Sequence, residues 1–138
     1  MKKENPYNEI IRLDAADESC TVLTKKGSLY SWGKNDRGQL GTGPGVGVEY
    51  VEGERYPLLV ENTNNRIVTD YTIGDGTLMY KDNMDNLYKS GMKLCYAPEK
   101  INIDKNINVK SFCCGNSFYS FISGKLKLRF NNLIIIFF

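Results

Sequence analysis

YSWGKNDRGQLG, residues 30–41, is the stretch of sequence that decides the fold of this chain. The residues before it, from Cys20 to Thr24, are rich in β-formers, and Lys25-Lys26-Gly27 can make a short turn with glycine where a left-handed residue is needed. Ser28 to Trp32 then reads as the return strand. The sequence therefore predicts a β-hairpin over residues 20–32, followed by a loop that Gly33 and Gly38 punctuate.

The same pattern of strand, turn and strand occurs again further along the chain. Thr77 to Lys81 followed by Asn86 to Gly91 gives a second hairpin, and a third begins at Gly115 and fades after Leu126. Such a repeat outweighs local propensity as an indicator of fold. Each hairpin is preceded by a further apolar stretch, and these stretches are Ile10 to Leu13, Ile67 to Thr72 and Ile107 to Phe112.

Proline-led segments, Pro57 to Val60 and Pro98 to Ile101, come before two of those apolar stretches. Three to four short strands for each repeat are typical of propeller blades. The 13 glycines and nine tyrosines also favour strands and tight turns over long helices. The sequence therefore predicts an all-β protein.

On residues 30–41 the chain resembles the regulator-of-chromosome-condensation repeat, whose signature is tryptophan-glycine, asparagine, then glycine-glutamine-leucine-glycine. The resemblance extends from about Ile10 to Leu126. It implies a partial β-propeller of antiparallel blades, an incomplete ring, because propellers of this family resemble closed rings of about seven blades. The positions that match the signature are Trp32, Gly33, Asn35, Gly38, Gln39, Leu40 and Gly41.

These signature residues have a structural explanation. Trp32 is expected to close the hydrophobic layer between blades and Leu40 to re-enter the core, while the glycines permit close backbone approaches. Asn35 and Gln39 can bond backbone groups of the loop. We expect these residues to shape a blade rather than to carry chemistry, so the resemblance implies no catalytic residue, no cofactor and no metal.

Departures from the family pattern indicate a divergent copy. The family often has a glycine and, three residues on, a histidine at the start of the hairpin strand, and the histidine is missing from all three repeats. In the second repeat, residues 93–96 (KLCY) replace glycine-glutamine-leucine-glycine. At the family's glycine and histidine positions, the three repeats have Asp17 and Cys20, Gly74 and Thr77, and Gly115 and Phe118.

Five segments follow from this interpretation. They are an N-terminal extension (1–9), a first repeat (10–60) with a loop insertion (43–56), a second, degenerate repeat (61–101), an incomplete third repeat (102–126) and a hydrophobic tail outside the family (127–138). Three interpretations of the tail stay open: a buried last strand, a partner-binding strand, or sequence translated beyond a mis-assigned gene boundary. The last is favoured because the family signature stops where the composition changes.

Composition argues against several function classes. The 18 basic and 16 acidic residues are interspersed, so a net charge of +2 offers no broad surface for nucleic acid. The absence of histidine removes the commonest general base, and Cys20, Cys95, Cys113 and Cys114 lack the spacing of a zinc site. The run Gly41 to Gly47 lacks the spacing of a phosphate cradle. The acidic residues Asp14, Asp17, Glu18, Asp82 and Asp85 are expected to be solvated turn residues.

The ends of the chain give no targeting or spanning signal. MKKENPYNEI has no apolar run behind its lysines, and the longest apolar run, Leu133 to Phe138, is far shorter than the roughly 20 residues that a membrane helix needs. We therefore expect no membrane span and an intracellular location, cytoplasmic or nuclear.

These observations predict a non-catalytic protein–protein interaction scaffold, a truncated fragment of a propeller. The alternative is a guanine-nucleotide exchange factor, or part of one, for a small GTPase, which some family members are. Such factors displace nucleotide through protein contacts, so missing histidine and metal do not exclude this activity. A protein partner, possibly a small GTPase, is expected on either interpretation, while a gene-model fragment without activity of its own remains a third possibility.

Overall fold

The structure is a computed structural model that describes residues 9–43, 54–61, 63, 65–93, 95–116, 118–123, 127–130 and 133–136. The regular elements of these residues are all β-strands, and among them no helix is long and apolar enough to cross a membrane. Three four-stranded antiparallel sheets follow one another along the chain. Their strands are β1 (Ile10–Ala16), β2 (Ser19–Thr24), β3 (Leu29–Gly33) and β4 (Glu54–Leu59); β5 (Val68–Gly74), β6 (Thr77–Asp82), β7 (Leu87–Gly91) and β8 (Cys95–Lys100); and β9 (Val109–Cys114), β10 (Tyr119–Ser123), β11 (Lys127–Phe130) and β12 (Leu133–Ile136).

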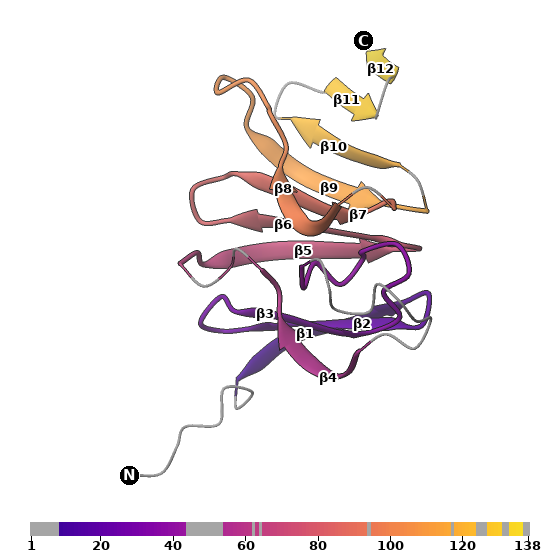
Figure 1. Ribbon diagram of the computed structural model, residues 1–138. Coiled ribbons are helices and arrows are strands. Elements are labelled where there is room, and N and C mark those ends of the chain that lie inside the picture. The colour runs from indigo at the N-terminus through magenta and orange to yellow at the C-terminus, as the bar shows by residue number, and fades with distance from the viewer. Residues whose placement is uncertain are drawn as a thin grey trace.

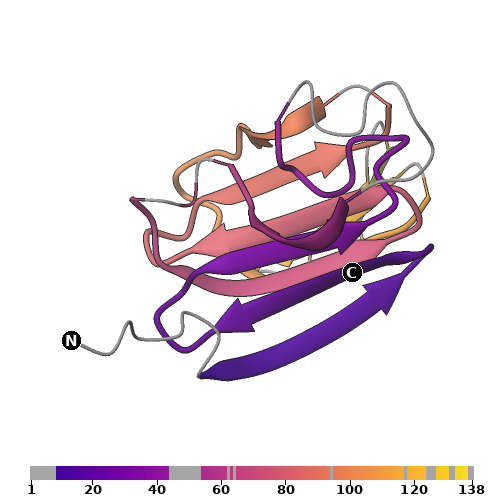
Figure 2. The same cartoon turned by 60° about the horizontal axis from the view of Figure 1, so that its bottom comes forward.

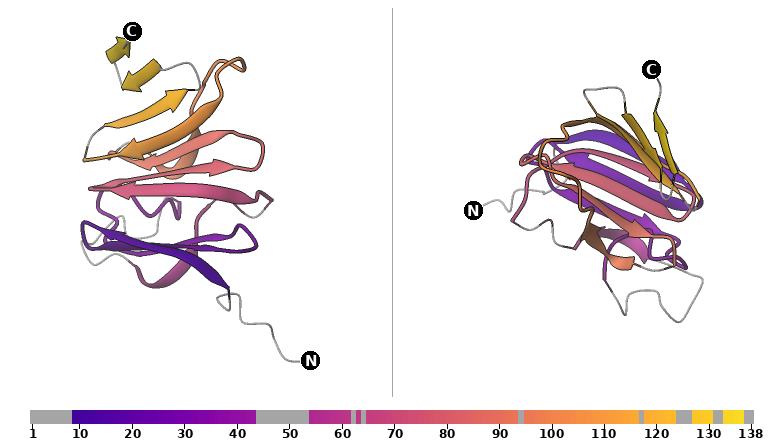
Figure 3. Two further views of the ribbon diagram at one scale, coloured as in Figure 1. Left: turned by 180° about the vertical axis from the view of Figure 1, so that it is seen from behind. Right: turned by 90° about the horizontal axis from the view of Figure 1, so that it is seen from above.

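The three sheets lie face to face as successive blades (Figure 1). Strand order within each blade follows the chain, so every blade is an up-and-down meander. Seen along the stack, the blades fan out from one another without closing a ring (Figure 3). The prediction of an all-β partial propeller with an incomplete ring is confirmed.

The two predicted hairpins are present and occupy corresponding positions. β2 pairs with β3 and β6 pairs with β7, both antiparallel, in the middle of the first and second blades (Figure 2). Gly27 in the β2–β3 turn has φ +82°, the left-handed conformation for which glycine was expected there.

Strand register recurs from blade to blade. Leu13 is paired with Val22, Tyr71 with Tyr80 and Phe112 with Phe121, at the same separation each time. The first two strands of each blade (β1–β2, β5–β6 and β9–β10) also carry a register shift at the matching place, at residues 11, 69 and 110. A bulge of this kind increases the local right-handed twist. The first strand pair therefore has the same register and the same bulge in all three blades.

This register divides each blade into two faces, which we call leading and trailing. The leading face packs on the preceding blade, and the trailing face packs on the following blade. Leading positions are Leu13, Ala15, Cys20 and Val22 in the first blade, Tyr71, Ile73, Leu78 and Tyr80 in the second, and Phe112, Cys114, Tyr119 and Phe121 in the third. Trailing positions include Thr21, Leu23 and Leu29, then Met79 and Leu87, then Ser120 and Ile122.

Two hydrophobic clusters fill the spaces between blades. Between the first and second blades, Leu23 and Leu29 pack against Leu78 and Tyr80. Between the second and third blades, the cluster consists of Met79, Leu87, Ile101, Val109 and Phe121, with Phe112, Cys114 and Tyr119 against it. Tyr80 also stacks on Tyr88, with ring centroids 4.9 Å apart. Burial of this apolar surface is the main force that holds the blades together.

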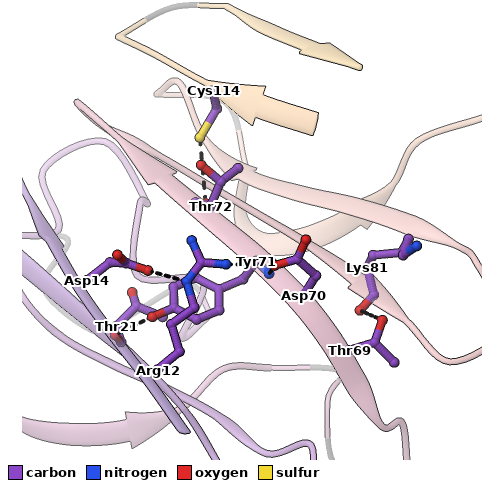
Figure 4. Close-up of polar contacts among 9 residues, drawn as sticks. All are labelled: Arg12, Asp14, Thr21, Thr69, Asp70, Tyr71, Thr72, Lys81 and Cys114. Carbon is purple, nitrogen blue, oxygen red and sulfur yellow. Dashed lines mark hydrogen bonds and ion pairs between the residues drawn. The ribbon is translucent and has the colours of Figure 1, made fainter. Parts of the chain in front are cut away.

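Polar contacts cross both interfaces as well (Figure 4). Tyr71 Oη donates a hydrogen bond to the carbonyl oxygen of Thr21 over 2.9 Å. The Arg12 guanidinium lies 4.5 Å from the centre of the Tyr71 ring and pairs with Asp70 at 2.7 Å. At the next interface Cys114 Sγ lies 3.6 Å from the carbonyl oxygen of Thr72. These contacts fix the lateral position of one blade on the next.

The C-terminal tail differs from its expectation. The sequence predicts a third repeat that stops at Leu126 and a tail without a partner strand. In the structure, β11 pairs with β10 and β12 pairs with β11, which completes a four-stranded third sheet. Alternation of Leu128 and Phe130 with charged residues provides a strand that can pair along β10. That the tail lies outside the family stays a prediction.

Several predicted features lie outside the described residues. These are residues 1–8 of the N-terminal extension, residues 44–53 of the loop insertion and Leu94 of the segment that replaces the second signature. The structure describes Gly43 at one end of the insertion, and its other end, from Glu54, forms β4.

Trp32 lies on the leading face of the first blade. The alternation of β3 directs Leu29 and Ser31 to the second blade and Tyr30 and Trp32 to the opposite side. Trp32 is half-buried there and belongs to neither of the two clusters between the described blades. Its expected role in closing a layer between blades stays a prediction.

Asp82 corrects another expectation. It was expected to be a solvated turn residue, but its side chain is only 2% exposed. Its carboxylate accepts hydrogen bonds from Met84 N and Asn86 N, each at 2.9 Å, and from Asn86 Nδ2 at 3.0 Å. Burial alone would raise the pKa of Asp82, but these donors outweigh it and hold the pKa below its usual value. The expectation holds for Asp85 in the same turn, whose side chain is 68% exposed.

Candidate interaction surface at the turn end of the blades

The loop that carries the signature, residues 34–42, is folded around its own buried polar side chains. Asn35 Oδ1 accepts a hydrogen bond from Leu40 N at 3.1 Å, and Gln39 Oε1 accepts one from Arg37 N at 2.9 Å. Ser31 Oγ donates to the carbonyl oxygen of Leu40 at 2.6 Å. Asn35, Gln39 and Leu40 are each at most 3% exposed. The loop therefore has a core of its own.

This loop leaves the first blade and lies on the second. Lys93 N donates to the carbonyl oxygen of Arg37, and Gly43 N donates to that of Tyr96, both at 3.0 Å. A Cβ on Gly38 would lie 2.7 Å from the Cys95 carbonyl oxygen, so only glycine permits this approach. Gly38 thus acts between blades, where residues 34–42 lie against the second blade and hold it, an arrangement that we call the clasp.

Gly33 brings the start of the loop against the β1–β2 turn. With φ +104°, it lies so close that a Cβ would meet the carbonyl oxygen of Glu18 and lie 2.8 Å from Ser19 Cα. Lys34 N then donates to the Glu18 carbonyl oxygen at 3.0 Å. Gly91 and Met92 repeat this arrangement on Gly76 of the second blade.

Turns that join the first two strands of each blade meet at this end of the molecule, and we call their polar residues the turn row. Asp17 and Glu18 come from the first blade, Asp75 from the second and Asn116 from the third. Two cations from the signature loop bridge them. Lys34 Nζ lies 3.6 Å from Asp17 and 3.7 Å from Glu18. Arg37 donates to Asp75 at 3.2 Å and to Asn116 at 2.5 Å, and so connects two further blades.

Charges in the turn row shift one another's pKa values. The negative charge of Asp17 is the main cause that raises the pKa of Lys34, with smaller contributions from Asp36 and Glu18 and a partial opposing effect of burial. The pKa of Asp75 is raised as well, first by the neighbouring Asp17 carboxyl and then by desolvation, while Arg37 acts in the opposite direction. Carboxylates and cations alternate along the row, which makes it a cohesive polar surface across three blades.

Sequence reasoning locates the signature loop but not the surface that it builds. The structure brings Asn35, Gly38, Gln39, Leu40 and Gly41 together in one loop. Gly33 ends β3 directly before this loop, and Trp32 lies on the leading face of β3. Asp17 and Glu18 were interpreted only as turn residues, and Lys34, Arg37, Asp75 and Asn116 received no role. Asp17, Asp75 and Asn116 share a place shortly after the first strand of each blade, and this recurrence is the signal that could have identified the turn row.

Removing Asn35 tests the loop's internal bonding. Asn35→Ala is expected to lower the free energy of unfolding by about 1–3 kcal/mol, because Leu40 N loses its acceptor in a buried place. Urea unfolding monitored by circular dichroism measures the loss. Asp36→Ala, in the same loop but exposed, is the control and should change stability by no more than about 0.5 kcal/mol. Equal effects of the two variants would contradict the buried role of Asn35.

Curated relatives resemble this chain over parts of their length. The serine/threonine-protein kinase Nek9 of Xenopus laevis is 27% identical over 128 residues, which cover 83% of this chain and 13% of the kinase. The E3 ubiquitin-protein ligase HERC2 of Mus musculus is 36% identical over 66 residues, 48% of this chain and 1% of the ligase. The chain therefore spans a small part of each relative.

A solved structure shares the fold. Prp20p from Saccharomyces cerevisiae, whose binding to Gsp1p and histones was studied with its crystal structure, matches with a TM-score of 0.74 at 18% identity. The match covers 88% of this chain and 33% of Prp20p. At this identity the similarity establishes the architecture of the blades and not their partners.

Residues 26–80 match the profile of the regulator of chromosome condensation (RCC1) repeat. The matched range begins in the β2–β3 turn, includes the whole signature loop and ends in β6 of the second blade. The interface between the first two blades thus coincides with the family's repeat. Together with the propeller architecture, this match shows that residues 26–80 of the chain form a repeat of the regulator of chromosome condensation (RCC1) type.

Proposed function

We propose that this chain is a non-catalytic protein-interaction module, and that the turn row is the surface that receives the partner. The observation that carries the proposal is that Arg37 of the first blade joins turn residues of the second and third blades, while Lys34 pairs with the turn of its own blade. These contacts present exposed polar groups on a fixed frame. Glu18 is 80% and Asp75 41% exposed beside these cations. A preorganised polar surface of this kind binds a complementary protein with little loss of side-chain freedom.

Support for a protein partner also comes from the family. Prp20p, with the same fold, is described by its binding to Gsp1p and to histones. Within the residues that the structure describes, no group of histidine, cysteine or carboxylate side chains is arranged to hold a metal ion. By analogy with Prp20p, we propose that the chain acts inside the cell by contact with another protein, with a small GTPase as one candidate.

A matched pair of charge reversals tests the turn row. Glu18→Lys changes an exposed acidic turn residue with φ +61° at this end, and Asp85→Lys changes one with the same φ in the β6–β7 turn at the other end of the blades. Proximity labelling in cells, followed by quantitative mass spectrometry, compares both variants with the wild type. We expect Glu18→Lys to lose partners that Asp85→Lys retains. Identical partner sets for all three proteins would reject the turn row as the interface.

An exchange-factor assay addresses the alternative function. The purified chain is added to a Gsp1p-type GTPase loaded with fluorescent guanine nucleotide, and nucleotide release is followed over time. A scaffold is expected to leave the release rate unchanged. Acceleration that rises with chain concentration would instead make the chain part of an exchange factor.

A further inference from the structure

A lysine and a cysteine lie in direct contact on the outer strands of the second blade. Lys89 Nζ of β7 donates a hydrogen bond to Cys95 Sγ of β8 over 3.3 Å, and Glu99 Oε2 lies 3.8 Å from the same nitrogen. Cys95 is 6% exposed, and the side chain of Lys89 is 21% exposed. An amine and a thiol are thus held together in a place that is largely shielded from solvent.

This contact arises where the second repeat departs from the family pattern. In the first blade, the place of Lys89 is taken by Ser31, whose Oγ donates to the carbonyl oxygen of Leu40 in the signature loop. The second repeat has residues 93–96 (KLCY) in place of glycine-glutamine-leucine-glycine, and Cys95 belongs to this replacement. The change that removes the signature from the second repeat therefore supplies the thiol that Lys89 contacts.

The Cys95 thiol is poorly suited to ordinary thiol chemistry. Burial is the main cause that raises its pKa, and a hydrogen bond with Glu99 acts in the same direction while Lys89 opposes both. The sulfur therefore stays protonated near neutral pH and is a weak nucleophile toward disulfides and alkylating reagents in solution. The reactive group in direct contact with it is the Lys89 nitrogen.

We propose that Lys89 and Cys95 form a redox modification site, at which dioxygen inserts one oxygen atom between Nζ and Sγ as an N–O–S bridge. The Lys89 ammonium first releases a proton to water. The amine then loses one N–H hydrogen and the thiol its S–H hydrogen, while the O–O bond breaks and the N–O and S–O bonds form. The second oxygen atom leaves as water with these two hydrogens. Nitrogen and sulfur are oxidised, and dioxygen is reduced by four electrons.

The bridge fixes the backbone on which the clasp lies. A Cβ on Gly38 would lie 2.7 Å from the Cys95 carbonyl oxygen, and Gly43 N donates to the Tyr96 carbonyl oxygen at 3.0 Å. A covalent link from Cys95 to Lys89 ties this segment to β7 and closes a ring over residues 89–95. Oxidation therefore stabilises the contact between the first two blades, and reduction releases it.

Mass spectrometry of the full chain tests the bridge. Incubation in air-saturated buffer is expected to add about 14 Da, whereas sulfenic or sulfinic acid at a thiol would add about 16 or 32 Da. Dithiothreitol should reverse the gain by supplying four electrons and four protons, which a methyl group of the same mass would resist. Trypsin should release residues 82–93 joined to residues 94–100 from the oxidised chain, because a modified Lys89 is not cleaved.

Three variants assign the two ends of the bridge. Lys89→Arg, which keeps the positive charge beside Glu99, and Cys95→Ser are each expected to lose the mass gain. Cys113→Ser, which removes an exposed thiol of the third blade, is the matched control and should retain it. Circular dichroism verifies that all variants are folded. No reversible gain in the wild type, sulfenic or sulfinic acid alone at Cys95, or a gain that persists in Lys89→Arg or Cys95→Ser would overturn the proposal.

Thermal unfolding measures the effect of the bridge on the clasp. The oxidised wild type is expected to melt roughly 5 °C above the reduced one, because a short covalent ring restricts the unfolded chain. Lys89→Arg should melt at one temperature before and after exposure to air. Equal melting temperatures for the bridged and the reduced wild type would show that the bridge does not support the clasp.

Discussion

Gly33→Ala is expected to lower the free energy of unfolding by about 3 kcal/mol or more, enough to unfold much of the population of a marginally stable chain. Two costs combine. A side chain is strained at φ +104°, and the new Cβ would collide with the backbone of the β1–β2 turn at Glu18 and Ser19. Backbone atoms of a paired hairpin cannot move aside as the end of a flexible side chain can.

Thermal unfolding and urea titration of Gly33→Ala measure this loss. Met92→Gly is the informative control, since Met92 has φ +61° and glycine relieves about 1–2 kcal/mol of left-handed strain there. This relief exceeds the cost of about 0.4–1 kcal/mol for the greater freedom of glycine in the unfolded chain, so a small net gain is expected. Opposite signs for the two substitutions are the expected pattern. Near-wild-type stability of Gly33→Ala would mean that the close approach of this loop to the turn is not required.

Asp82→Ala is expected to lower the free energy of unfolding by about 3 kcal/mol. The buried carboxylate accepts three hydrogen bonds from Met84 and Asn86, and its removal leaves the backbone donors of the β6–β7 turn without an acceptor. Asp85→Ala, in the same turn but 68% exposed, is the control and should have a small effect. Comparable losses for the two variants would contradict a buried role for Asp82.

The pH dependence of stability separates the contribution of the Asp82 charge from that of a neutral hydrogen-bond acceptor of the same size. Because folding lowers the pKa of Asp82 below its usual value of 3.8, its charge stabilises the folded chain above about pH 4, and this contribution is lost as the pH falls through the folded pKa. Asp82→Asn retains an acceptor but does not titrate. The difference in unfolding free energy between wild type and Asp82→Asn should therefore shrink between pH 7 and pH 3. A constant difference would argue against a charged Asp82.

Local sequence patterns were sufficient for the hairpins and for the repeat. Alternation around Leu29, the glycine at position 27 and the second copy over residues 77–91 predict β2–β3 and β6–β7 and place them in successive blades. Each of these signals lies within one strand pair, where neighbouring residues decide the conformation. The all-β class and the open propeller follow from their repetition.

Contacts between blades were beyond the same reasoning. Alternation along β3 says which residues share a face but not which face meets a neighbour, so it could not show that Leu29 and Ser31 face the second blade. Asp82 was taken for a surface residue because an Asp in a turn is usually solvated. The turn row depends on Arg37 reaching Asp75 and Asn116, which are far away along the chain. Such contacts become visible only when the blades are placed side by side.

The clasp formed by residues 34–42 has a consequence for synthesis on the ribosome. Its acceptors and neighbours on the second blade, Cys95 and Tyr96, leave the exit tunnel long after the loop itself. During that interval Gly38 and the loop around Asn35 lack the second-blade backbone on which they pack in the folded chain. We expect the first blade to gain protection from proteolysis only after Tyr96 has emerged, so that the second blade locks the first as translation proceeds.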